Sequence, residues 1–151
     1  MNNKIKFKGL EDDIKTIAEL QYNWDKLSNK TLLVSGGTGF IGAFLCDVIR
    51  YRNEKYSQNI RVISLSRRGG QDDETVTYLQ RDITVPFLAN DKVDYVIHLA
   101  SNTHPKQYAE DPIGTITTNI YGCDNLLRIA SENHARFLLA SSVEIYGQGT
   151  P

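Results

Sequence analysis

The residues whose types and spacing could do chemistry are three glycines, Gly36, Gly39 and Gly42, which directly follow the apolar run 31–35. A glycine turn of this spacing between a strand and a helix is typical of sites that bind the pyrophosphate of a dinucleotide. The first glycine permits a tight turn, the second lets backbone approach the phosphates, and the third lets helix and strand pack closely. The predicted contacts are Gly36, Thr38, Gly39, Phe40, Ile41 and Gly42.

A second feature is the turn Ser66-Arg67-Arg68, which leaves the strand predicted at 60–65. In a dinucleotide fold this turn meets the adenosine ribose. An acidic residue there binds the 2′-hydroxyl of NAD, whereas an arginine pairs with the 2′-phosphate of NADP. Ser66 stands where the acid often stands and two arginines follow, so the turn favours NADP. The alternative is a solvated basic turn, and the cofactor stays open as NAD or NADP.

A third feature is the pair Asp82-Ile83, just after the short strand predicted at 75–80. Asp82 could pair with the adenine amino group while Ile83 covers the ring. The alternative interpretation is a cap at the end of the strand. Two histidines, His98 and His104, lie on and just after the strand predicted at 93–100. Because no carboxylate or cysteine accompanies them at ligand spacing, we expect no metal.

Composition limits the class of protein. The chain has 151 residues and a formal net charge of −1, which suits one globular domain and gives no sign of a nucleic-acid-binding surface. No apolar run approaches the roughly 20 residues of a membrane span, and residues 1–8 lack the apolar core of a signal peptide. Cys46 and Cys123 are far apart in sequence, which argues against a disulfide scaffold. We expect a cytoplasmic protein.

The elements that must position these residues follow from the hydrophobic pattern. Strands are predicted at 31–35, 60–65, 75–80, 93–100 and 136–140, with helices after the first strand and from Asp111 onward. The predicted fold is α/β, a Rossmann-type doubly wound parallel sheet of five strands in the order 3-2-1-4-5. Ahead of it, apolar residues at helical spacing predict one amphipathic helix over 10–27, packed through Ile14, Ile17 and Trp24. A partner-binding or dimer role for this helix is the alternative.

Several segments together resemble one family. They are 36–42 (GGTGFIG), 82–83 (DI), 98–101 (HLAS), 118–122 (TNIYG) and 141–147 (SSVEIYG). In this order and spacing they resemble the extended short-chain dehydrogenase/reductase family, which includes NAD-dependent nucleotide-sugar epimerases and dehydratases. The stretch from His98 to Asn119 is most similar to UDP-glucuronate decarboxylases. The Ser142-x-Glu144 spacing also resembles the 4,6-dehydratases, although Val143 stands where those enzymes usually carry an aspartate.

The resemblance implies a reaction and a set of roles. Such enzymes oxidise the sugar 4-hydroxyl by hydride transfer to the nicotinamide, and the ketone then enables decarboxylation, elimination or epimerisation at the neighbouring carbon. Ser142 matches the hydroxyl that hydrogen-bonds the reacting 4-oxygen, and Glu144 the carboxylate near C5, which acts as base or positions the substrate. A strand-end cap and a solvated carboxylate are the alternatives. Further cofactor contacts implied by the motifs are Leu99, Ala100, Ser101 and Thr118.

One part of the family pattern is missing from this sequence. The family's base is the tyrosine of a Tyr-x-x-x-Lys motif, and no such motif follows residue 142. We therefore expect residues 1–29 to be a helical extension and residues 30–151 a truncated NAD(P)-binding Rossmann domain that lacks its substrate domain and is inactive alone. Its full-length parent would act on a nucleotide sugar, and a homodimer is left open. The alternative is a complete non-catalytic NAD(P)-binding module that serves as a sensor or interaction protein.

Overall fold

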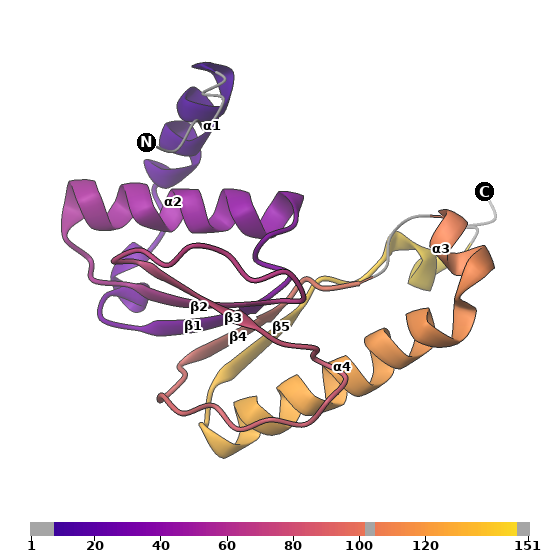
Figure 1. Ribbon diagram of the computed structural model, residues 1–151. Helices are drawn as coiled ribbons and strands as arrows, with labels where there is room; N and C mark the ends of the chain where they lie inside the picture. The colour runs from indigo at the N-terminus through magenta and orange to yellow at the C-terminus, as the bar shows by residue number, and fades with distance from the viewer. Residues whose placement is uncertain (1–7, 102–104, 148–151) are drawn as a thin grey trace.

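One parallel sheet forms the centre of the protein. The structure is a computed structural model and describes residues 8–101 and 105–147 (Figure 1). Its five strands lie in the order β3-β2-β1-β4-β5, which confirms the predicted fold and strand order. Their bounds are β1 Thr31–Ser35, β2 Arg61–Ser66, β3 Val76–Gln80, β4 Tyr95–His98 and β5 Arg136–Leu139. Leu32 of β1 is in register with Val62 of β2 and Tyr95 of β4.

Helices cover both faces of this sheet. Helix α2 (Phe40–Tyr56) lies over one face and α4 (Pro112–Glu132) under the other, as Figure 1 shows. The remaining helical elements are α1 (Lys8–Ala18), α3 (Pro105–Glu110) and the short 3-10 helices η1 (Trp24–Leu27) and η2 (Val143–Tyr146). Of the helices that the structure describes, none combines the length and apolar character needed to cross a bilayer.

Burial on both faces explains why the central strand β1 is so apolar. All five residues of β1 are buried, as expected for a central parallel strand that is covered on both sides. Neighbouring residues of β1 pack in different clusters. Leu33 joins the cluster on the α4 side with Leu126 and Ile129, whereas Leu32 and Val34 join the cluster on the α2 side. Because all neighbouring strands are parallel, their carboxyl ends lie along one side of the sheet, which forms its carboxyl edge. The two clusters hold the strands in this arrangement.

The N-terminal extension corrects one prediction. The helix expected over 10–27 is wrong in its second half, because α1 ends at Ala18 and the chain resumes as the 3-10 helix η1. A long-range contact caps the end of α1, since Arg52 of α2 donates from Nη1 to the Ala18 carbonyl oxygen at 3.0 Å. Ile17 was expected to pack but is exposed, while Trp24 is half-buried and the buried contact is Ala18. Helical spacing alone did not reveal this break.

Candidate dinucleotide-binding site

The glycine turn lies where β1 ends and α2 begins. Gly36 has a φ of +75°, a left-handed conformation that side chains rarely adopt, and a Cβ there would lie 3.0 Å from the Ala100 amide nitrogen. A Cβ on Gly42 would lie 2.6 Å from the Gly37 Cα. Only glycine therefore lets α2 start this close to β1 and to the chain leaving β4. Gly37 itself is buried against Ser64 of β2, a contact that the sequence did not predict.

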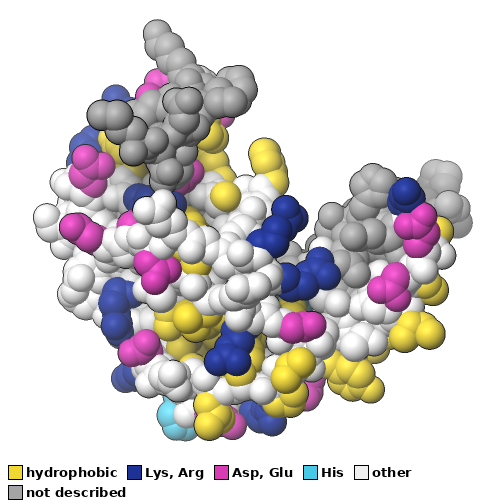
Figure 2. Space-filling model, viewed as in Figure 1, with side chains coloured by type: hydrophobic (Ala, Val, Ile, Leu, Met, Phe, Trp, Pro, Cys, Tyr) yellow, Lys and Arg dark blue, Asp and Glu magenta, His cyan; other side chains and the backbone are white. Residues whose placement is uncertain are grey.

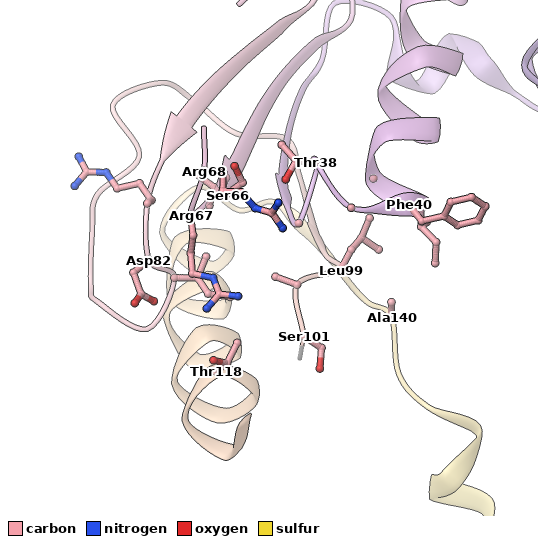
Figure 3. A pocket seen from close by; sticks show the side chains of 18 residues that line it. Thr38, Phe40, Ser66, Arg67, Arg68, Asp82, Leu99, Ser101, Thr118 and Ala140 are labelled. Carbon is pink, nitrogen blue, oxygen red and sulfur yellow. The ribbon is translucent and has the colours of Figure 1, made fainter. Parts of the chain in front are cut away.

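The start of α2 offers unpaired backbone donors. Gly39 is the N-cap residue and makes no side-chain capping bond, and the first intrahelical bond runs from the Ala43 amide to the Gly39 carbonyl at 2.8 Å. The amides of Phe40, Ile41 and Gly42 thus have no carbonyl acceptor within the helix. In Figure 3 the Phe40 ring points away from the other labelled residues, and it is 94% exposed. Phe40 consequently offers the cavity its backbone rather than its ring.

The turn after β2 lies beside the glycine turn because β2 pairs with β1. Ser66 is the last residue of β2, and its hydroxyl donates to the Gly69 carbonyl oxygen at 3.3 Å. Arg67 and Arg68 follow as exposed residues. The end of β3 holds this turn in place, since the Gln80 side-chain amide donates to the Arg67 carbonyl oxygen at 3.0 Å.

Asp82 and Ile83 have different surroundings. One oxygen of Asp82, Oδ1, accepts from the Thr84 amide at 2.9 Å and from the Thr84 hydroxyl at 2.8 Å. These two hydrogen bonds, and secondarily the charge of Arg67, lower the pKa of the Asp82 carboxyl, so the group is an anion at neutral pH. Ile83 is buried, and its carbonyl oxygen accepts from Asn125 of α4 at 2.8 Å. Asp82 thus closes a turn with Thr84 after the end of β3, and this turn uses one of the two carboxylate oxygens.

A buried serine–histidine pair supports the chain that leaves β4. Ser35 Oγ lies 2.7 Å from His98 Nδ1, and both side chains are buried. The same serine oxygen accepts from the amides of Leu99 at 3.2 Å and Ala100 at 3.3 Å. Because the hydroxyl already accepts these two bonds, its own proton is left for Nδ1, which requires a neutral imidazole with its proton on Nε2. Burial lowers the pKa of His98, in agreement with this neutral form.

All the residues predicted to hold a dinucleotide line one cavity of about 420 Å³ at the carboxyl edge of the sheet (Figure 3). Its lining also includes three residues that the sequence did not indicate, which are Leu65, Arg81 and Ala140. Arg81 belongs there because its amide donates to the Ser66 carbonyl oxygen at 3.0 Å. Ala140 follows β5, and a small residue after a predicted strand gives no signal of its own. The cofactor-binding roles themselves stay predictions.

The predicted catalytic pair follows β5 in the chain. Ser142 is exposed in the segment between β5 and η2, and its carbonyl oxygen accepts from the Ile145 amide at 3.3 Å. Ser142 is not among the described residues that line the cavity. Glu144 belongs to η2. The roles of both residues stay predictions.

No metal centre is visible among residues 8–101 and 105–147, where no cluster of three or more potential ligand side chains occurs. The His98 imidazole is hydrogen-bonded to Ser35 within the sheet, and His104 lies outside the described residues. The polar groups that line the cavity are instead backbone amides, hydroxyls, arginines and one carboxylate.

Comparisons with known proteins agree with this architecture. Curated relatives include UDP-glucuronic acid decarboxylase 5 of Arabidopsis thaliana, which is 36% identical over 128 residues that cover 80% of this chain and 36% of that protein. UDP-glucuronic acid decarboxylase 1 of Danio rerio is 32% identical over 121 residues, with coverage of 78% and 28%. The chain thus spans about a third of the length of the curated relatives it matches.

Solved structures show the same fold. The Bordetella bronchiseptica enzyme WbmF in complex with NAD+ superposes with a TM-score of 0.62 at 22% identity, covering 79% of this chain and 38% of that chain. UDP-glucose 4-epimerase from Bifidobacterium longum in complex with NAD+ and UDP gives a TM-score of 0.58 at 24% identity, with coverage of 78% and 38%. The sequence profile of the NAD dependent epimerase/dehydratase family matches residues 32–151. With its glycine turn, its strand order and this match, the chain belongs to the NAD dependent epimerase/dehydratase family.

Proposed function

We propose that this chain binds a nicotinamide dinucleotide and forms the cofactor-binding part of an enzyme that modifies nucleotide sugars through a transient 4-keto intermediate. The observation that carries the proposal is the cavity itself. It joins the uncapped start of α2 to the turn after β2 and to the segment after β4. Ligands of open parallel sheets bind at such a carboxyl edge, where the strand order reverses.

The residues present fit this cofactor. The free amides at Phe40, Ile41 and Gly42 suit a pyrophosphate, which the dipole of α2 also favours. Asp82 retains a second carboxylate oxygen for the adenine amino group, and Ile83 supplies an apolar wall. When bound, the cofactor accepts a hydride from the sugar and later returns it. The family description names NAD, and the neighbours include structures with bound NAD+, which supports a nicotinamide dinucleotide as the ligand of this cavity.

The sugar chemistry is proposed from the family pattern. Ser142, exposed after β5, would donate a hydrogen bond to the reacting 4-oxygen, and Glu144 would act near C5 as base or positioning group. The curated relatives are named UDP-glucuronic acid decarboxylases. These names support a uridine-diphosphate sugar acid as the leading candidate substrate and decarboxylation as the leading candidate reaction. The family's Tyr-x-x-x-Lys motif does not occur after residue 142 in this sequence, so we propose that these 151 residues alone bind the cofactor without turnover.

Calorimetric titration of this chain with NADH and with NADPH tests the proposal. We expect one-to-one binding of at least one dinucleotide and no conversion of UDP-glucuronate when NAD+ or NADP+ is present. Gly36→Ala should weaken binding and cost about 1–2 kcal/mol of stability, because an alanine at positive φ is strained.

The matched control is Gly9→Ala in α1. A Cβ there meets nothing within 4 Å, so this variant should bind normally and gain up to about 1 kcal/mol of stability from better helix propensity. If wild-type protein bound neither dinucleotide, or if Gly36→Ala bound as well as Gly9→Ala, the proposal would be wrong.

A further inference from the structure

The adenosine end of the cavity is basic. Ser66, Arg67, Arg68 and Arg81 line it together with a single carboxylate, Asp82. In Figure 3, Arg67 and Asp82 lie on the same side of the cavity, across from Phe40. Figure 2 shows dark blue basic side chains at the hollow between the body of the sheet and the α3 end of the molecule. Three cations and one anion thus gather where a ribose would lie.

The backbone fixes this arrangement. Ser66 pairs in register with Gln80 of β3, and the Arg81 amide donates to the Ser66 carbonyl oxygen at 3.0 Å. The Gln80 side chain holds the Arg67 carbonyl at 3.0 Å, and Gly69 adopts a φ of +67° as the turn closes. Two arginines on a tethered turn lose less freedom on binding an anion than two arginines on a free loop.

The arginines that line the cavity are not paired in salt bridges with other described residues. Among the ion pairs between described residues, none involves Arg67, Arg68 or Arg81. By contrast, Arg50 on the neighbouring α2 is paired with Asp47 at 2.8 Å and with Asp73 at 2.6 Å. The cavity arginines are therefore available to an anionic ligand.

The position of Ser66 points to the same ligand. In sites that take NAD, an acidic residue about 20 residues after the glycine motif accepts hydrogen bonds from the ribose hydroxyls and would repel a phosphate there. Here that position, at the end of β2, carries a serine whose hydroxyl donates to Gly69. Serine places no negative charge beside the 2′-oxygen. The site therefore lacks the group that selects NAD and has the groups that bind a phosphate.

We propose that Arg67 and Arg68 form a subsite for a phosphate on the ribose 2′-oxygen, so that this chain prefers NADP(H) to NAD(H). The inference rests on the proposed function, because it assigns the specificity of the same cavity. It departs from the family description, which names NAD. Arg68, next to the glycine turn, and Arg67, next to Asp82, would pair with the phosphate oxygens through charge-assisted hydrogen bonds.

The test uses two ligand pairs that each differ by one phosphate: NADPH with NADH, and 2′,5′-ADP with 5′-AMP. Calorimetry at fixed salt on the wild-type chain should give about 10- to 100-fold tighter binding of the phosphorylated member of each pair. The double variant Arg67→Ala/Arg68→Ala should lose that difference while keeping its NADH affinity. Ser66→Asp should reverse the preference. The control Arg136→Ala removes an exposed arginine from β5, the outer strand on the other side of the sheet from β3. It should change neither the preference for the phosphorylated ligands nor the affinity for NADH.

The outcomes separate the two proposals. Equal binding of NADPH and NADH by wild-type protein would overturn the 2′-phosphate subsite and leave the dinucleotide site standing. A preference for NADPH that survives in Arg67→Ala/Arg68→Ala would also overturn it. Binding of neither dinucleotide would overturn the proposed function. Circular dichroism of each variant establishes that the exposed substitutions leave the fold intact.

Discussion

At the scale of single residues, the site depends on glycines, because they carry no Cβ atom where the backbone lies close to its neighbours. Gly36, Gly37 and Gly42 each bring the backbone so close to a neighbour that a methyl group would collide. The same closeness leaves the amides at the start of α2 open to the cavity. The Ser35–His98 pair then holds the opposite wall, because Ser35 Oγ accepts from the two amides that follow β4.

The buried Ser35–His98 pair predicts that the stability of the protein depends on pH. Burial lowers the pKa of the His98 imidazole, so below about pH 6.5 the unfolded chain binds a proton that the folded chain resists. Stability should fall as the pH drops from 7 to 5, by about 1.4 kcal/mol for each unit by which the pKa is lowered. The carboxyls whose pKa is lowered, such as Asp82 and Asp94, contribute stability that is present above about pH 4 and is lost only as the pH falls further, outside this range.

Urea unfolding at several pH values measures this effect. His98→Gln should flatten the dependence between pH 7 and 5, even though the variant is less stable at pH 7. His134→Asn is the control, because His134 is exposed and its left-handed φ of 53° also suits asparagine. An unchanged slope in His98→Gln would show that His98 does not carry the pH dependence.

Much of the site could be predicted because its signals are local. The glycine spacing, the turn at Ser66 and the pair Asp82-Ile83 each follow a strand that the hydrophobic pattern reveals. Arg81 could not be found this way, since its place depends on the pairing of β2 with β3. Gly37 was missed because its neighbour, Ser64, is distant in sequence and meets it only after β1 and β2 pair.

At the scale of elements, the strands were predictable and the N-terminal extension was not. Apolar runs and one short alternating segment predicted five strands of a parallel sheet, and the structure confirms their order. The last residue of α1, Ala18, is instead bound by Arg52 of α2, a buried residue with only 8% of its surface exposed. Its guanidinium lies 4.8 Å from the Trp24 ring and 3.9 Å from the Tyr56 ring. Arg52 thus attaches the extension to α2 through a buried side chain.

We predict that Arg52→Ala loosens this attachment. It removes the bond to Ala18, the bond to Gln58 at 2.9 Å and two cation–π contacts, and should cost about 2–4 kcal/mol of stability. Trp24 is the only tryptophan, so its fluorescence should shift to longer wavelength as the ring becomes solvated.

The matched control for this variant is Lys55→Ala. Lys55 also links α2 to the extension, through Glu19, but the pair is partly exposed and should contribute less than about 1 kcal/mol. Equal losses in the two variants, or unchanged Trp24 emission in Arg52→Ala, would contradict the role given to Arg52.

At the scale of the whole molecule, two apolar clusters on opposite faces of one sheet form a scaffold whose carboxyl edge carries the cavity. The family match begins at residue 32, and the extension lies before it. The chain spans about a third of the length of its curated relatives, and the function that we propose for it is cofactor binding.

The most direct test of that claim is a nuclear magnetic resonance titration of the ¹⁵N-labelled chain, whose mass of 17.0 kDa suits the method. With NADPH or NADH, the amide signals of residues 36–42, 66–68 and 82–83 should shift together and saturate at one equivalent. The amide signals of α1 should not shift. If no signal moved, or if the shifts fell outside the residues that line the cavity, the cavity at the carboxyl edge of the sheet would not be a dinucleotide site.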